Sequence, residues 1–290
     1  MTIPSDKTER ANYYDREYNA RESVPDFSLY PQLYRKLSDD AHASTPCHRD
    51  VAYGPGSGDL LDIFPAAQAG SPVLLFIHGG YWRALSKADS AFMAPALTKS
   101  GACVVVLEYD LAPVVKLDHI VDQARRALAW IYHNIARYGA DPERIFASGS
   151  SAGGHLSGML LPQGWQAKYG VPANVLRGAM PISGLFDLLP LLETHVNDWM
   201  NLDEADATRN SPALNLPTSG TDTELVITCG DLETTEFKRQ SQDFLDRWQS
   251  LDLTGKVVAA PGKNHYDIVL DLGIPGTLIN RAILELMRLD

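Results

Sequence analysis

The stretch Gly149-Ser150-Ser151-Ala152-Gly153 decides the fold, because it places a serine between glycines directly after an apolar run. That run, residues 145–147, predicts a strand, and residues 155–161 predict a helix. A G-x-S-x-G pattern between a strand and a helix is typical of a nucleophile elbow, a strained turn that lifts the serine hydroxyl clear of a sheet. We therefore predict that Ser151 is a nucleophile, with the amides of the following helix pointing at charge that develops beside it.

A second glycine segment lies upstream, where a buried-looking strand at 73–77 runs into His78-Gly79-Gly80-Tyr81-Trp82. Glycines let a backbone approach a reacting carbonyl closely, where a side chain would collide. Backbone N–H groups of such a loop, together with that of the residue after the nucleophile, can stabilise an oxyanion. The predicted donors are the N–H groups of Gly79, Gly80, Tyr81 and Ala152.

The same upstream loop also supplies candidates for the walls of a substrate pocket. Tyr81 and Trp82 are predicted to line this pocket, because the loop holds them near the reacting carbonyl. His78 is interpreted as a structural residue that braces the loop. His155, four residues after Ser151, is expected to pack rather than to react.

A serine nucleophile needs a base, which in hydrolases with this elbow follows the serine and the acid in the chain. Only His195 and His265 lie well beyond Ser151. His265 stands in a Pro-Gly loop after a short strand that begins near residue 256, and such a loop suits a histidine that reaches over the sheet edge. We therefore predict His265 as the base. His195 either lines the pocket or is exposed.

The acid is expected after the strand that ends at Gly230, where two carboxylates follow. Asp231 comes directly after the glycine, and Glu233 comes three residues after it. The acid of this fold usually lies a few residues into the loop, which favours Glu233, with Asp231 as the alternative.

These segments resemble those of the α/β-hydrolase superfamily, and within it the branch of the kynurenine formamidases (arylformamidases) and related esterases. The resemblance covers nearly the whole chain and rests on His78-Gly-Gly-Tyr-Trp82, Gly149-Ser-Ser-Ala-Gly-Gly-His-Leu156, Glu233-Thr-Thr-Glu-Phe-Lys-Arg-Gln-Ser241 and Asn264-His-Tyr-Asp-Ile-Val269. In that family the third segment typically reads D-S-P-E-F-x-R-Q-S, and its Asp is the triad acid. Glu233 stands at the matching position. The change from Asp to Glu lengthens the side chain and suggests a bacterial side branch rather than a true formamidase.

The resemblance implies an α/β-hydrolase fold, with a mostly parallel, doubly wound, eight-stranded sheet and helices on both faces. It also implies a serine hydrolase that needs no cofactor and cleaves a small, aromatic-linked amide, formamide or ester through an acyl-serine intermediate. Two alternatives stay open: a carboxylesterase acting on short-chain esters, and a non-catalytic ligand-binding protein on the same fold.

The rest of the chain fits one domain over residues 1–290, since 290 residues with 45% hydrophobic content can bury one large core. Alternating strands and helices predict parallel pairing, with a site at the carboxyl ends of the strands. The predicted strands include 59–64, 102–109 and 175–181, and the predicted helices include 117–138, 237–251 and 277–289. Residues 1–45, an aromatic-rich arm, and the insertion 186–217 are expected to form a small lid; alternatively, the aromatics only pin the arm to the body.

Composition limits the partners. A formal net charge of -11 argues against nucleic acid or an anionic membrane and leaves a small-molecule substrate, with a homodimer left open. The three cysteines form no C-x-x-C pair and no metal-ligand spacing, so no metal is expected. No apolar run approaches the ~18–20 residues of a membrane span, and the start lacks the apolar core of a signal peptide. These features predict a cytoplasmic protein.

Overall fold

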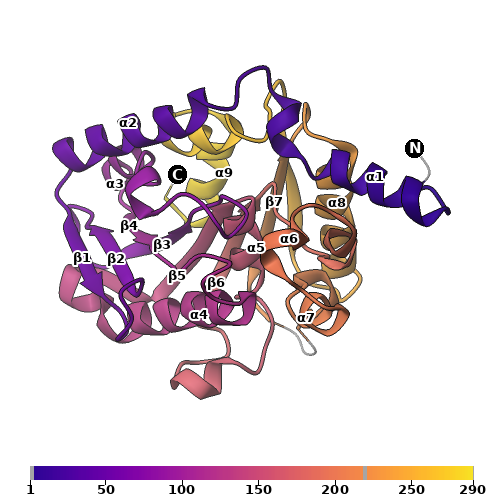
Figure 1. The fold of residues 1–290 in the computed structure, drawn as a ribbon. Helices are drawn as coiled ribbons and strands as arrows, with labels where there is room; N and C mark the ends of the chain where they lie inside the picture. Colours follow the sequence, from indigo (N-terminus) through magenta and orange to yellow (C-terminus); the bar gives the residue numbers. More distant parts are fainter. Residues whose placement is uncertain (1–2, 218–220, 290) are drawn as a thin grey trace.

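The computed structural model describes residues 3–217 and 221–289, and its centre is one sheet with the strand order β1-β2-β4-β3-β5-β6-β7-β8 (Figure 1). The strands are β1 (His48–Ala52), β2 (Leu60–Phe64), β3 (Ser71–Ile77), β4 (Cys103–Leu107), β5 (Ala140–Ser150), β6 (Leu176–Ile182), β7 (Glu224–Gly230) and β8 (Gly255–Ala260). The β1–β2 and β2–β4 pairs are antiparallel, and the other neighbours run parallel. The predicted eight-stranded, mostly parallel sheet is therefore confirmed.

Helices cover both faces of this sheet (Figure 1). They are α1 (Lys7–Glu17), α2 (Leu29–Ser44), α3 (Ala94–Lys99), α4 (Leu117–Asn134), α5 (Ala152–Gly158), α6 (Asn197–Met200), α7 (Glu204–Arg209), α8 (Thr235–Gln249) and α9 (Leu278–Leu286). One core joins α4, α5 and α8 to the sheet face that carries Val73 and Leu75, and a second core joins α2, α3 and α9 to the face that carries Leu74 and Phe76. This alternation along β3 follows from the two-residue period of a strand.

Parallel pairing brings the carboxyl ends of β3, β5, β7 and β8 to one edge of the sheet. The loops that leave these ends carry His78, Ser151, Glu233 and His265, which are far apart in the sequence. The topology therefore gathers the predicted site residues at one edge, as is usual for open parallel sheets.

Some elements differ from the prediction. The helix expected at 155–161 begins at Ala152 and ends at Gly158. The helix expected at 117–138 is α-helical to Asn134 and continues as a 3-10 turn, Ile135–Tyr138, before Gly139 ends it with φ 82°. Strand β1 and the two arm helices, α1 and α2, are not among the elements predicted from the sequence.

The arm is held to the body by tyrosine hydroxyls. Tyr13 and Tyr18 both donate to the buried carboxylate of Glu236 in α8, at 3.1 and 3.0 Å. Gln240, one helical turn further along α8, donates to Tyr18 Oη at 2.5 Å and to Asp187 O at 2.9 Å. The E-F-K-R-Q-S stretch of α8 thus anchors both regions expected to form a lid. These tyrosines therefore hold the arm to the body.

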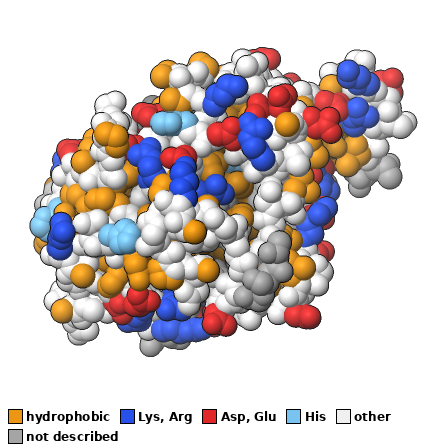
Figure 2. Space-filling model, turned by 90° about the horizontal axis from the view of Figure 1, so that it is seen from below, with side chains coloured by type: hydrophobic (Ala, Val, Ile, Leu, Met, Phe, Trp, Pro, Cys, Tyr) orange, Lys and Arg blue, Asp and Glu red, His pale blue; other side chains and the backbone are white. Residues whose placement is uncertain are grey.

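No helix within residues 3–217 and 221–289 combines the length and apolarity that crossing a membrane requires. On the face that Figure 2 shows, acidic and basic side chains are interspersed rather than gathered into one patch of a single sign. The net charge of -11 is therefore not concentrated on that face.

Replacing Gly153 with alanine should disrupt the packing of α5 on β3. A β-carbon at this position would lie 1.9 Å from Ile77 O and 2.7 Å from His78 O, which are backbone atoms that cannot rotate away. We expect a loss of about 3 kcal/mol in the free energy of unfolding, or failure to fold. The control is Gly164→Ala, because Gly164 has φ 99° with no heavy atom within 4 Å and should cost about 1–2 kcal/mol of backbone strain. Urea denaturation measures both, and equal losses would contradict the close approach at Gly153.

Candidate active site

Ser151 lies on a strained turn between β5 and α5. Its φ and ψ are 58° and -117°, a conformation that non-glycine residues rarely adopt. Ser151 N donates to Ile182 O at 2.9 Å, and His155 N donates to Ser151 O at 2.9 Å, so the turn is bonded to β6 on one side and to its own helix on the other. A β-carbon at Gly149 would lie 2.4 Å from Gly153 O, which explains the paired glycines. This geometry matches a nucleophile elbow.

Glu233 and His265 form a buried pair beside this turn. The distance from Glu233 Oε2 to His265 Nδ1 is 2.6 Å, and the two residues are 4% and 5% exposed. The other carboxylate oxygen, Oε1, accepts from Ser183 Oγ at 2.5 Å and from Gly230 N at 2.7 Å. Burial alone would raise the pKa of the Glu233 carboxyl, but the charge of His265 and these hydrogen bonds lower it below its ordinary value.

Asp231, the alternative acid, points elsewhere. Its Oδ1 accepts from Gly262 N at 2.7 Å in the loop after β8, and its side chain is exposed. No hydrogen bond or ion pair joins it to a histidine within the described residues. The structure therefore brings Glu233, and not Asp231, to His265.

The loop after β3 approaches the elbow closely. A β-carbon at Gly79 would lie 2.7 Å from Ser150 O and 3.4 Å from Ser151 Cβ, so only glycine fits between the two turns. Gly80 has φ 100°, and a β-carbon there would lie 2.1 Å from Ala84 O. In the part of the chain that the structure describes, no hydrogen bond leads from the N–H groups of Gly79, Gly80 or Tyr81 to another protein group. These amides are free to bind an oxygen of a ligand.

A cavity of about 390 Å³ opens at this edge and is lined by several of the predicted site residues. It is lined by Ser151, His265, Gly79, Gly80 and Tyr81, together with aromatic side chains from the body and the arm. Ala152 is fully buried at the first position of α5.

Trp82 does not line the cavity, which corrects the prediction that it forms a pocket wall. Its indole is fully buried, and Nε1 donates to His155 Nδ1 at 3.2 Å. Tyr81 and Trp82 have φ values of 50° and 55°, and this left-handed stretch sends the two neighbouring side chains to different places. Tyr81 lines the cavity and donates to Tyr18 O of the arm at 2.6 Å.

Two histidines near the site have structural contacts. His78 stacks on Tyr109 with ring centroids 4.0 Å apart, and its Nδ1 lies 3.0 Å from Gly79 O, so it braces the loop as predicted. His155 is fully buried between Trp82 Nε1 and Asn210 O, and its Nε2 lies 2.7 Å from that carbonyl. Such an imidazole accepts at Nδ1 and donates at Nε2, which is the neutral form.

Comparisons with known proteins agree with this geometry. The BD-FAE family model matches residues 61–169. The chain is 32% identical to kynurenine formamidase of Salmo salar, over 82% of this chain and 81% of that protein. It is 30% identical to kynurenine formamidase of Danio rerio, over 95% of this chain and 94% of that protein. The chain belongs to the kynurenine formamidase family of α/β-hydrolases. It is a hydrolase of formamide or ester substrates, and esterases are also among its relatives.

The fold of this formamidase-family chain also matches solved esterase structures. An inhibited form of esterase B from Lactobacillus rhamnosis superposes with a TM-score of 0.71 at 18% identity, over 90% of this chain and 94% of that one. At this identity the match supports the α/β-hydrolase fold and no finer assignment.

The cavity is also lined by residues from the two regions that were expected to form a lid. The arm contributes Tyr18, Arg21, Phe27 and Tyr34, so it lines the cavity as well as being pinned to the body. The 186–217 insertion contributes His195 and Trp199. His195, for which lining and exposure were both open, is held with Nδ1 2.5 Å from Asp15 Oδ1 in α1. The aromatic content of the two regions had indicated such a role, whereas Arg21 was not singled out from the sequence.

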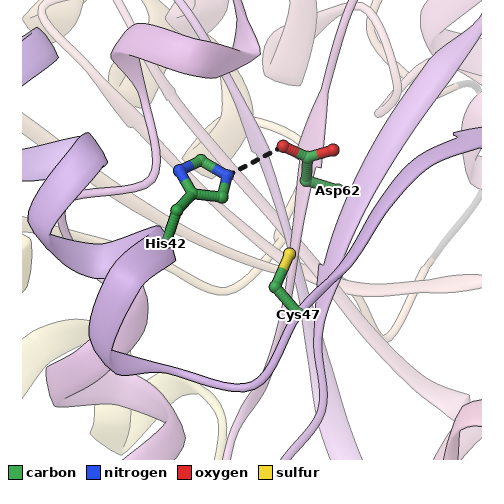
Figure 3. A group of neighbouring side chains, drawn as sticks. All are labelled: His42, Cys47 and Asp62. Atoms are coloured by element: carbon green, nitrogen blue, oxygen red, sulfur yellow. Dashed lines mark hydrogen bonds and ion pairs between the residues drawn. The ribbon is translucent and has the colours of Figure 1, made fainter.

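A separate cluster outside the formamidase-like site could in principle hold a metal ion. Donor atoms of His42, Cys47 and Asp62 lie within 4.8 Å of one another, with His42 Nε2 2.9 Å from Asp62 Oδ2 (Figure 3). Asp62 is fully buried, and its other oxygen accepts from Lys87 Nζ at 2.7 Å. Because Lys87 already compensates this carboxylate, we interpret the cluster as an ion-pair network that joins α2 to β2 and assign no metal to it.

The stability of the protein should fall in weak acid because of His155. Burial lowers the pKa of His155 from 6.5 to about 4. Between these values the unfolded chain binds more protons than the folded one, so stability is lost as the pH falls from 6.5 towards 4. The difference between the pKa of His155 in the unfolded and the folded chain corresponds to about 3 kcal/mol in the free energy of unfolding. Urea denaturation at a series of pH values should show a weaker pH dependence in His155→Gln, whereas exposed His119→Gln should behave like the wild type. If the free energy of unfolding of His155→Gln depends on pH as strongly as that of the wild type, His155 is not the cause of the loss.

Proposed function

We propose that the chain is a serine hydrolase in which Ser151 is the nucleophile, His265 the general base and Glu233 the acid that orients the base. The proposed oxyanion donors are the backbone N–H groups of Gly79, Gly80, Tyr81 and Ala152. The observation that carries this proposal is the buried Glu233–His265 pair at 2.6 Å, whose histidine lines the same cavity as the strained Ser151. Nucleophile, base and orienting acid are the parts that acyl transfer requires.

The steps follow from these positions. His265 takes the proton of the Ser151 hydroxyl, and the serine oxygen attacks the carbonyl carbon of the substrate. The backbone amides hold the oxyanion, and Glu233 stabilises the imidazolium that forms. The leaving amine or alcohol takes its proton from His265. Water activated by the same histidine then releases the acyl group from Ser151, and no step requires a cofactor.

The proposed substrate is a small aromatic-linked formamide, amide or ester. Its flat group would fit among aromatic side chains of the cavity, including Phe27, Tyr34, Trp199 and Tyr266. Formamidase relatives that share 30% and 32% of their residues over most of both chains support the formamide. A carboxylesterase acting on short-chain esters is the second candidate, because the same machinery cleaves both bonds. A non-catalytic ligand-binding role is not favoured, since Ser151, Glu233 and His265 are all present.

Turnover of N-formylkynurenine and of p-nitrophenyl acetate by the same preparation tests this proposal. Efficient cleavage of the formamide would support a formamidase. Fast ester cleavage without formamide turnover would favour the carboxylesterase and leave the proposed triad intact. Absence of both activities would contradict the proposed substrate class.

A further inference from the structure

Ser183 touches the candidate triad from behind, without lining the cavity. It follows the last residue of β6, its side chain is fully buried, and its Oγ donates to Glu233 Oε1 at 2.5 Å. The backbone of Ser183 has φ 50°, in the left-handed region, where a residue with a β-carbon is disfavoured relative to glycine. The chain therefore keeps a side chain at a position that glycine would occupy with less strain.

The backbone around Ser183 joins the nucleophile turn to the strand that leads to the acid. Ser183 N donates to Thr228 O of β7 at 2.9 Å. The carbonyl oxygen of the preceding residue, Ile182, accepts from Ser151 N at 2.9 Å. Consecutive residues at the end of β6 thus hold the elbow on one side and β7 on the other. The position of the Ser183 hydroxyl is therefore fixed relative to Ser151.

The carboxylate of Glu233 needs fixed donors, because the side chain is long and enters the site from a loop. The terminal torsion of a glutamate is broad, so burial alone does not decide which way the plane of the carboxylate faces. Ser183 Oγ and Gly230 N both donate to Oε1, at 2.5 and 2.7 Å, while Oε2 lies 2.6 Å from His265 Nδ1. Loss of the Ser183 hydroxyl would remove one of these two donors and let the carboxylate turn away from His265.

We propose that Ser183 is a positioning residue, whose hydroxyl fixes the plane of the Glu233 carboxylate so that Oε2 stays aimed at His265. The inference rests on the proposed function, in which Glu233 orients the base. A hydrogen bond to a charged group is stronger than one between neutral groups. The imidazolium that forms on His265 is stabilised only while the carboxylate faces it. Because Ser183 acts through Glu233 and does not line the cavity, its loss should lower kcat and leave KM nearly unchanged.

Two variants remove the hydroxyl with different effects on the backbone. Ser183→Gly relieves the strain of φ 50°, whereas Ser183→Ala retains it. Both should lower kcat about 10- to 100-fold for whichever of N-formylkynurenine and p-nitrophenyl acetate the wild type cleaves, as expected for one hydrogen bond to a charged group. KM should change by less than about threefold. Urea denaturation should find Ser183→Gly more stable than Ser183→Ala, so that activity follows the hydroxyl and not the stability.

Ser148→Ala is the matched control. Ser148 lies in β5 and is also fully buried, but its Oγ donates to a backbone carbonyl, Met180 O, at 2.6 Å and not to the acid. This variant therefore loses one buried hydrogen bond as well. Its free energy of unfolding should fall, while its kcat should stay close to that of the wild type.

A double-mutant cycle with Glu233→Gln shows whether Ser183 acts through the acid. Because Glu233→Gln already lacks the charged carboxylate, adding Ser183→Gly should lower kcat further by less than about threefold. Losses that multiply, or folded Ser183 variants with the kcat of the wild type, would overturn the inference, while the loss of activity in Glu233→Gln would still support the triad. Failure of both Ser183 variants to fold, beside a folded Ser148→Ala, would overturn it in favour of a purely structural role. A wild type inert towards both substrates would overturn the proposed function as well.

Discussion

Replacing Ser151 with alanine should lower kcat for formamide and ester substrates by about 10⁴-fold or more. Loss of the nucleophile in a comparable serine hydrolase costs about 10⁶-fold, with a residual rate from the oxyanion hole and substrate binding. Ser151 is held in a strained turn with φ 58°, and alanine retains the same backbone preferences, so the fold should persist. The loss should therefore fall on kcat.

Steady-state kinetics and urea denaturation of Ser151→Ala test this expectation together. The control is Ser150→Ala, because Ser150 is the preceding residue and lines the same cavity. It should keep most of the activity. A Ser151→Ala protein that is folded and retains more than a tenth of the wild-type kcat would show that another group attacks the carbonyl.

Replacing Glu233 with glutamine should lower kcat/KM by about 10⁴-fold, the effect of the equivalent acid-to-amide change in another triad. An uncharged amide cannot stabilise the imidazolium of His265, and its NH₂ group favours the wrong tautomer of the ring. Glutamine still offers an oxygen to Ser183 Oγ and Gly230 N, which now donate to Glu233 Oε1 at 2.5 and 2.7 Å. The local structure should therefore survive the change.

Asp231→Asn is the matched control for the acid. Asp231 lies two residues before Glu233 and is exposed, and its carboxylate accepts from Gly262 N at 2.7 Å. We expect it to retain activity of the same order as the wild type, measured with the same substrates. An inactive Asp231→Asn beside an active Glu233→Gln would reverse the assignment of the acid.

Much of the fold and of the candidate site could be predicted from the sequence, because the candidate catalytic residues lie directly after the ends of strands. An apolar run followed by a glycine turn marks the end of a parallel strand, and parallel strands bring their carboxyl ends to one edge. The segments at 78–82, 149–153, 231–233 and 265 each follow such a run. Their convergence therefore depends on topology and not on fine packing. The choice of Glu233 over Asp231 needed the length of the loop and the family motif.

The lining of the cavity could not be predicted in the same way, because it depends on contacts between distant segments. Tyr81 and Trp82 are neighbours, yet one lines the cavity and the other is fully buried against His155. The two side chains diverge because Tyr81 and Trp82 both have positive φ values. Such values are rare for residues other than glycine, so they could not be predicted from the sequence. Arg21 and Arg83 come from the arm and the oxyanion loop, 62 positions apart, and the hydrogen bond from Tyr81 Oη to Tyr18 O joins these two segments.

Labelling with a fluorophosphonate probe, followed by mass spectrometry of the peptides, tests the central claim most directly. The probe reacts with an activated serine and reports the residue without any assumption about the natural substrate. We predict one adduct per chain, on the peptide that carries Ser151, and its loss in Ser151→Ala. Glu233→Gln should be labelled more slowly. An adduct on another residue, or an unlabelled wild-type protein, would contradict the assignment of Ser151 as the nucleophile.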